Sequence, residues 1–176
     1  MSEFISDLLK MFDGRDRSLD AGEPLFHRGD PVSALYIVTD GEVHLIRYQE
    51  NGDAIILQRA GAGDVLAEAS LFSDRYHCAA VARTRTAATG IPRRALRARL
   101  REDPDFAEAW AAHFAREIQN TRFRSEVLSL RTVGARLDAW LTWHDAMPPK
   151  GAWKELAFEI GVSPEALYRQ MAKRRT

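Results

Sequence analysis

Cysteine is nearly absent from this sequence: among 176 residues, Cys78 is the single one. A disulfide within the chain is therefore excluded, as is any iron–sulfur or zinc site that needs four cysteine ligands. The chain also carries no net charge, because 25 Lys and Arg balance 25 Asp and Glu. Charge is instead distributed unevenly, with seven arginines and no acid between Arg83 and Arg101. We interpret that run as a solvated face rather than a second nucleic-acid site.

Long apolar runs are also missing. No segment approaches the roughly 20 apolar residues that a transmembrane helix needs. The first residues, Met1-Ser-Glu-Phe-Ile-Ser-Asp, lack the basic segment and long apolar run of a secretory signal. We therefore expect a cytoplasmic protein with no membrane partner. The 45% of apolar residues and the length suit a globular protein of one or two domains.

Residues 21–92 have the pattern of short strands separated by turns. Asp40-Gly41 and Asn51-Gly52 are dipeptides that tight hairpins prefer, because both central residues need a positive φ. Runs of β-branched and aromatic residues lie between the turns, as in half-buried strands. We expect strands at 34–38, 43–48 and 54–58, and two more near 76–82 and 87–92. This spacing predicts a sandwich, roll or barrel. Residues 1–20 are expected to form a short helical lead-in, because Phe4, Leu8, Leu9 and Phe12 have helical spacing.

After Pro92 the pattern becomes helical. Asp103-Pro104 is a typical helix start, and no Gly or Pro then follows until Gly134. Small and apolar residues recur along this helix at alternating spacings of four and three: Ala107, Ala111, Phe114, Ile118, Thr121, Ser125 and Leu128. Such a seam predicts a parallel homodimer. The alternative is a helix packed wholly on its own domain, a role that Phe106 and Trp110 on another face would serve.

The end of the chain predicts a helix-turn-helix. A helix at 133–144 ends in a Pro-Pro break, and a helix at 153–160 is followed by the turn Gly161-Val-Ser163 and a final helix. An Arg on such a helix can bond guanine bidentately, a Glu can accept a hydrogen bond from cytosine, and a Lys can meet a phosphate. The predicted contacts to double-stranded DNA are Ser163, Glu165, Arg169 and Lys173. The alternative is an exposed amphipathic helix with an ordinary Glu–Arg pair.

The segment Gly63-Asp-Val-Leu-Ala-Glu68-Ala-Ser-Leu-Phe72 resembles the phosphate-binding cassette of the Crp/Fnr family of bacterial regulators, usually Gly-Asp-x-x-Gly-Glu-x-x-Leu-Phe. The resemblance extends from Leu19 to Lys173 and implies an α+β chain. It comprises an N-terminal antiparallel β-roll of the cyclic-nucleotide-binding type (1–102), a long dimerisation helix (103–132) and a C-terminal helix-turn-helix DNA-binding domain (133–176). Because the chain stops at Thr176, we expect this domain to lack a full wing.

The resemblance also implies an effector site. In the family the cassette Glu accepts a hydrogen bond from a ribose hydroxyl, and the cassette's short helix offers backbone N–H groups to the phosphate. Ala67, Glu68 and Ala69 are the matching residues here. At the position of the family's phosphate-binding Arg stands His77, with Cys78 in place of the neighbouring Ser. Because His is mostly neutral at pH 7, cAMP sensing in the family's usual manner is not expected.

Two further positions match the family's effector site. Thr121 on the long helix matches a Thr that contacts the purine across the dimer, and its neighbour is Arg122 where a Ser is usual. The alternative is that Thr121 belongs to a polar layer that sets the register of the paired helices. The expected effector is a small molecule, with a cyclic nucleotide as one candidate.

The function implied by the resemblance is a dimeric, one-component transcription regulator with RNA polymerase as a candidate partner. One alternative is a haem-based gas sensor that uses His77 or Cys78 as the iron ligand. Adjacent strand residues point to opposite faces, so only one of the two can reach the pocket and they cannot form a catalytic dyad. Another alternative is a module that docks a protein without binding DNA. No enzyme and no further metal site are expected, because no nucleophile–base pair or ligand cluster is found.

Overall fold

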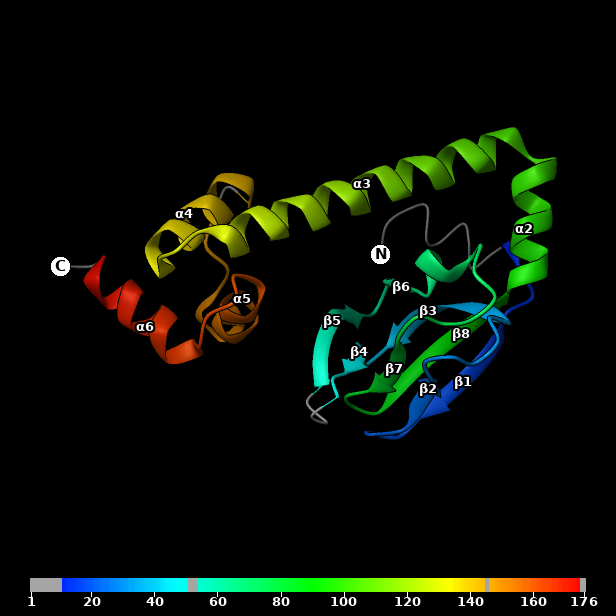
Figure 1. The fold of residues 1–176 in the computed structure, drawn as a ribbon, viewed down its shortest axis with the longest axis horizontal. Coiled ribbons are helices and arrows are strands. Elements are labelled where there is room, and N and C mark those ends of the chain that lie inside the picture. Colours follow the sequence, from blue (N-terminus) through cyan, green and yellow to red (C-terminus); the bar gives the residue numbers. More distant parts are fainter. Residues whose placement is uncertain (1–10, 51–53, 145, 175–176) are drawn as a thin grey trace. The chain divides into compact units, whose positions relative to one another are not determined.

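The computed structural model describes residues 11–50, 54–144 and 146–174 (Figure 1). The chain forms two units, Met1–Ala109 and Trp110–Thr176. The first unit contains the strands and the second contains the C-terminal helices. The helix α3 (Pro104–Ser129) contributes residues to both units.

The first unit is built from two antiparallel four-stranded sheets, as the roll predicted from the sequence requires. In order, the first sheet consists of β1 (Arg15–Leu19), β8 (Thr86–Pro92), β3 (Ala34–Asp40) and β6 (Val65–Leu66). The second consists of β2 (Pro24–Phe26), β7 (Ala79–Ala82), β4 (Glu42–Tyr48) and β5 (Ala54–Gly61). The five strands expected between residues 34 and 92 are therefore confirmed, with small shifts in their ends.

The core of the first unit comes from alternate residues of paired strands. In the register between β4 and β7, Val43 faces Ala82 and Leu45 faces Ala80, and all four side chains are buried in the same apolar cluster. The Phe26 ring stacks on Tyr76 with centroids 3.9 Å apart. Each buried aliphatic or aromatic side chain stabilises the fold by about 1.5–3 kcal/mol relative to leaving it exposed.

The helical expectation for the N-terminal segment is wrong for Arg15–Leu19, whereas Met11, the first described residue, is helical. Residues 1–20 were predicted to be helical, but Arg15–Leu19 form the strand β1, paired in register with β8 from Arg15↔Gly90 to Leu19↔Thr86. The free edge of β8 accepts this segment, and only Leu19 of the five residues is buried. Tertiary pairing therefore overrides the helical spacing. Phe4, Leu8 and Leu9, on which that expectation also rested, lie outside the described residues.

The predicted Asp40-Gly41 turn is found between β3 and β4, with Gly41 at φ 82°. A Cβ at Gly41 would lie 2.4 Å from the Arg85 carbonyl oxygen, so glycine is required by contact as well as by conformation. The Asn51-Gly52 turn lies outside the described residues.

Two helices follow β8. The first, α2 (Arg93–Glu102), ends at Asp103, and the second, α3, begins at Pro104 as predicted. The side chain of Asp103 caps α3, because its Oδ1 accepts a hydrogen bond from Phe106 N at 3.0 Å. With 26 residues, α3 is about 39 Å long. Phe106 is buried, whereas Ile118 and Leu128 of the predicted seam are 48% and 40% exposed.

The second unit contains α4 (Val133–His144), a short 3-10 turn (Lys150–Ala152), α5 (Trp153–Glu159) and α6 (Pro164–Lys173). These bounds confirm the predicted helix-turn-helix within about one residue. Its apolar core takes residues from α3 through α6: Val127, Leu137, Trp140, Trp153, Leu156, Ala157, Ile160 and Leu167.

Gly161 begins the turn at φ 65°, and a Cβ there would lie 2.4 Å from Leu128 Cδ2. Glycine therefore lets the turn lie directly against the end of α3.

Arg136 on α4 ties the turn to the end of α3. Its Nε donates to the Leu130 carbonyl at 2.8 Å, and its Nη2 to the Leu128 carbonyl at 3.0 Å. Its Nη1 reaches the carbonyls of Ile160 at 3.1 Å and Gly161 at 2.8 Å. These carbonyls lie at or just beyond the C-terminal ends of α3 and α5, where helix acceptors have no helical partner and a cation is favoured.

Within the described ranges, no helix is both long enough and apolar enough to cross a membrane.

We predict that Arg136→Ala lowers the free energy of unfolding of the second unit by roughly 1.5–3 kcal/mol, the range for hydrogen bonds from a charged donor. All four tryptophans, Trp110, Trp140, Trp143 and Trp153, belong to this unit, so urea unfolding followed by tryptophan fluorescence reports on it. The exposed Arg131→Ala is the matched control and should leave the midpoint unchanged. Equal midpoints for the two variants would contradict the structural role of Arg136.

Candidate effector site and nucleic-acid interface

The cassette predicted from the sequence, residues 63–72, contains β6 and precedes β7. Val38 N donates to the Asp64 carbonyl at 3.0 Å, and Gly63 N donates to the Val38 carbonyl at 2.8 Å, so the loop is fastened to the end of β3. A 3-10 turn, η1 (Glu68–Ser70), follows. It presents Glu68 as its first residue, partly exposed, with the carboxylate Oε2 buried.

Ala67 precedes η1 in a left-handed conformation, with φ 67° and ψ 12°. It is the one non-glycine residue with positive φ in the described parts of the chain. An L-residue in this region costs about 1–2 kcal/mol, whereas glycine adopts it without strain. This explains why the cassette pattern has Gly at this position. The replacement by Ala67 is tolerated with strain and leaves the turn intact.

Cys78 lies inside the first unit, 2% exposed and part of its apolar cluster. Burial raises the pKa of the Cys78 thiol; the positive charge of Arg47 opposes this shift, and the Glu68 carboxylate adds to it. The thiol is therefore close enough to sense both charges. A raised pKa disfavours the thiolate, which is the form that would ligate a haem iron.

Arg47 on β4 is a site residue that the sequence analysis missed. It follows Val43 and Leu45 at intervals of two, so its side chain leaves the strand on their inward face. Extending the β4–β7 register by one pair, beyond Ile46↔Ala79, sets Arg47 opposite Cys78. The Arg47 Nη2 donates to the His77 carbonyl at 3.5 Å, and its buried Nε has no hydrogen-bond partner within the described ranges.

His77 and Cys78 lie just before β7 rather than in a strand, and they differ in burial: Cys78 is buried and His77 is exposed. His77 lies at the surface, where its Nδ1 is 3.1 Å from the Ser70 Oγ of η1. Partial burial of the ring and the positive charge of Arg47 lower the pKa of His77, so the imidazole is neutral at pH 7. Ser70 is itself fully buried, and no sequence signal singled it out. His77 therefore supplies no positive charge beside the cassette, whereas Arg47 does.

The other predicted effector residues lie on η1 and on α3. Ala69 is exposed on η1. Thr121 and Arg122 are exposed on α3 and belong to the second unit. Their part in effector binding stays a prediction. In the described portion of the chain, no three His, Cys, Asp or Glu side chains gather where they could hold a metal ion.

The predicted DNA-contacting residues gather on α6. Ser163 is its N-cap, and the Ser163 Oγ accepts from Ala166 N at 3.2 Å. Glu165 and Arg169 are exposed one turn apart, while Leu167 between them is fully buried in the core. Hydrogen bonds from its own backbone N–H and from Ser163 lower the pKa of Glu165. One face of α6 thus packs on the unit, and the other presents charged side chains to solvent.

The basic end of the chain is only partly available for phosphates. Lys173 is exposed in the last turn of α6. Arg174 pairs with Asp138 of α4 and donates to the Gly134 carbonyl at 3.4 Å. It therefore contributes to holding α6 against α4. Arg175 lies outside the described residues.

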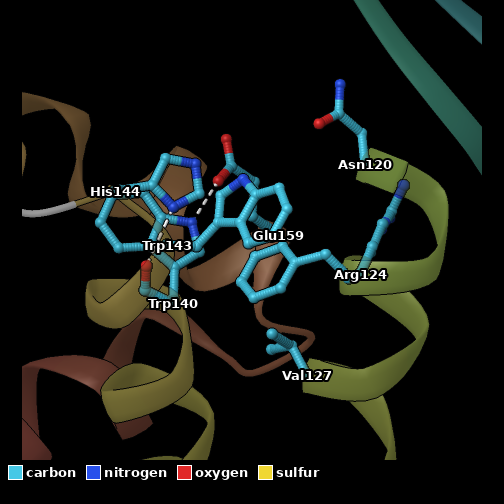
Figure 2. A pocket seen from close by; sticks show the side chains of 8 residues that line it. Asn120, Arg124, Val127, Trp140, Trp143, His144 and Glu159 are labelled. Atoms are coloured by element: carbon cyan, nitrogen blue, oxygen red, sulfur yellow. Dashed lines mark hydrogen bonds between the residues drawn. The ribbon is translucent and has the colours of Figure 1, made fainter. Parts of the chain in front are cut away.

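The second unit also contains a hollow of about 280 Å³ between α3, α4 and the end of α5 (Figure 2). The Phe123 ring stacks on Trp143 at 4.6 Å, and the Trp140 ring stacks on His144 at 3.8 Å. Trp140 Nε1 donates to Glu159 Oε2 at 2.7 Å, which joins α4 to α5. We interpret these contacts as the packing that holds the helix-turn-helix on the end of α3.

Comparison with known proteins gives the following matches. The cyclic nucleotide-binding domain family matches residues 16–103. The cAMP-activated global transcriptional regulator CRP of Haemophilus influenzae is 27% identical over 161 residues, which cover 85% of this chain and 72% of that protein. The cyclic AMP receptor protein of Thermus thermophilus is 32% identical over 117 residues, covering 66% of this chain and 54% of that protein.

Among solved structures, FixK2 from Bradyrhizobium japonicum aligns with a TM-score of 0.70 and 20% identity, covering 91% of this chain and 83% of that one. At this identity the likeness concerns the fold. The α+β architecture expected from the sequence is thereby confirmed.

We predict that Ala67→Gly stabilises the first unit by about 0.5–1 kcal/mol, because the strain that is relieved exceeds the entropy that glycine adds to the unfolded chain. Chemical unfolding followed by far-UV circular dichroism measures the change. Ala69→Gly, two residues on in η1, is the matched control and should destabilise by about 0.5–1 kcal/mol. Destabilisation by both variants would contradict the strained conformation of Ala67.

Proposed function

The chain belongs to the cyclic nucleotide-binding domain family and is a Crp/Fnr-like transcription regulator, and on that basis we propose that it senses a small anionic effector at the cassette and binds DNA through α6. The observation that carries the effector half is the Arg47 guanidinium, which reaches the His77 backbone beside the cassette, while the charges of both Arg47 and the cassette residue Glu68 act on the buried Cys78 thiol. A carboxylate and a guanidinium in one site would suit a ligand that offers both a hydroxyl group and an anionic group.

Arg47 replaces the charge that the cassette lacks. His77 is neutral at pH 7 and stands where the family's phosphate-binding Arg is expected. The Arg47 guanidinium reaches the same backbone from the neighbouring strand and keeps a buried N–H without a partner in the described ranges. An anionic oxygen would accept that N–H, while Glu68 would accept a hydrogen bond from a ligand hydroxyl. A cyclic nucleotide carries both groups.

Dimerisation through α3 is supported by apolar residues of the predicted seam that are exposed in the single chain. Ile118 and Leu128 lie at seam positions and are largely exposed, although apolar side chains of this size gain from burial. Their 3-4 spacing suits a second copy of the same helix. In this proposal the effector changes how the two copies of α3 pair and thereby resets the spacing of the two α6 helices.

DNA binding is supported by the two different faces of α6, one of which is buried while the other is charged and exposed. Leu167 anchors the helix, and the exposed Glu165 and Arg169 have the spacing and chemistry to read base edges. Lys173 would meet a phosphate.

We predict that a cyclic mono- or dinucleotide raises the thermal midpoint of the wild-type protein, and that Arg47→Gln weakens its binding roughly 10- to 100-fold. That factor corresponds to about 1.5–3 kcal/mol for one lost charge-assisted contact. Thermal-shift titrations give the affinities, and the exposed Arg28→Gln serves as the control with the same loss of charge. No shift with any of these nucleotides, or equal affinities for the two variants, would contradict the proposed effector class.

We further predict that the protein binds random duplex DNA at low salt, and that Lys173→Ala reduces the slope of log affinity against log salt by about 1. Fluorescence anisotropy over a salt series measures that slope. Arg28→Ala removes one charge from the first unit and should leave the slope unchanged. A wild-type protein with no affinity for duplex DNA at low ionic strength would instead support the docking of a protein partner through α6.

A further inference from the structure

A second hollow, in the first unit, is lined by arginines. It measures about 470 Å³ and lies between α2 and the segment before β3. Its lining residues are Val32, Ser33, Arg93, Arg94, Arg97 and Arg101. The backbone fixes this arrangement, because Arg93 N donates to the Ser33 carbonyl at 2.9 Å. The Arg93 Nε also donates to the Leu71 carbonyl at 2.9 Å, so the start of α2 is fastened to the end of the cassette.

The positive charge in this hollow is poorly neutralised by the protein. The Asp74 carboxylate lies 3.8 Å from Arg93 Nη2, but its side chain is fully exposed to solvent. Among the described residues, Arg94, Arg97 and Arg101 form no ion pair with a carboxylate. The guanidinium of Arg97 lies over the Phe72 ring, 5.4 Å from its centroid, and Arg101 Nε donates to the Arg97 carbonyl at 3.1 Å. Two of the arginines are thus positioned without being neutralised.

The packing of α2 on the unit rests on an apolar residue rather than on this cluster of positive charge. Leu96 is the fully buried residue that anchors α2, and the arginines lie around it. Arg93, Arg97 and Arg101 are spaced at four residues, at which like charges on a helix repel each other. The first turn of α2 carries Arg93 and Arg94 and no acid, although helix N-termini favour negative charge. A bound anion would relieve both unfavourable arrangements at once.

We propose that this hollow is a second ligand site, distinct from the cassette, that binds a small polyphosphate group. Arginine forks pair bidentately with phosphate oxygens. The lining offers Val32 as its apolar side chain, so the site suits a polyanion better than an apolar ligand. The volume lies within the usual range for small-molecule pockets, which favours a compact ligand over an extended nucleic-acid backbone.

Inorganic tripolyphosphate is the probe for this site, titrated calorimetrically into the full chain at about physiological ionic strength. The wild-type protein is expected to bind it, and the double variant Arg97→Gln/Arg101→Gln to bind at least tenfold more weakly. The matched control is Arg83→Gln/Arg85→Gln, which removes the same charge from exposed positions of the β7–β8 turn and should retain wild-type affinity. Absence of binding by the wild-type protein, or an equal loss in the control, would overturn the proposal.

Two further variants distinguish loss of this site from poor folding and from binding at the cassette. Arg94→Gln changes an exposed side chain that lines the hollow, so it tests the site should the double variant fold poorly, and a three- to tenfold loss is expected. Arg47→Gln should leave tripolyphosphate affinity unchanged, because Arg47 belongs to the cassette site. A loss in Arg47→Gln would place the anion at the cassette and overturn a separate site. Dependence of duplex-DNA affinity on Arg97 and Arg101, without tripolyphosphate binding, would overturn it in favour of a DNA surface.

Discussion

The register between β4 and β7 is the constraint on which the sensing unit depends. By setting Val43 opposite Ala82 and Leu45 opposite Ala80, it closes the apolar interior of the roll. The same alternation continues to Arg47, whose charge must follow the inward face because a strand cannot turn one side chain without turning its neighbours. A one-residue shift of this register would turn the buried side chains of β4 toward solvent. The same shift would move the Arg47 guanidinium away from the cassette. Packing and ligand chemistry are therefore set by one pairing.

The cassette itself is held in a strained form. Ala67 adopts a left-handed conformation that glycine would occupy freely, and this turn directly precedes the short helix that begins at Glu68. With His77 neutral, Arg47 supplies the positive charge of the proposed effector site. In that proposal the site keeps the carboxylate of the family pattern and takes its cation from the neighbouring strand. Such an exchange preserves the chemistry of an anionic ligand while altering the direction from which it is bound.

In the second unit, Arg136 has a comparable role. Its guanidinium donates hydrogen bonds to carbonyls at the end of α3 and in the turn before α6, and Gly161 allows these two segments to lie close together. The Trp140–Glu159 hydrogen bond connects α4 to α5 (Figure 2). The stack of Phe123 on Trp143 connects α3 to α4. A movement of α3 would therefore carry the turn with it, because the carbonyls of both are bonded to the same side chain. This coupling suits a helix proposed to transmit an effector signal to α6.

The sequence by itself determined five of the strands, the helices from Pro104 onward, the Asp103 and Ser163 caps and the cassette with Glu68, because turn dipeptides, caps and spacing are local properties of the chain. It did not place Arg47 at the proposed effector site or reveal β1. Both depend on pairing between segments far apart in the sequence: β4 with β7, and β1 with β8. The arginines of α2 show the same division. Their spacing was visible as a charge run, but the hollow they line exists only because β8 and the Ser33 segment bring α2 against the cassette.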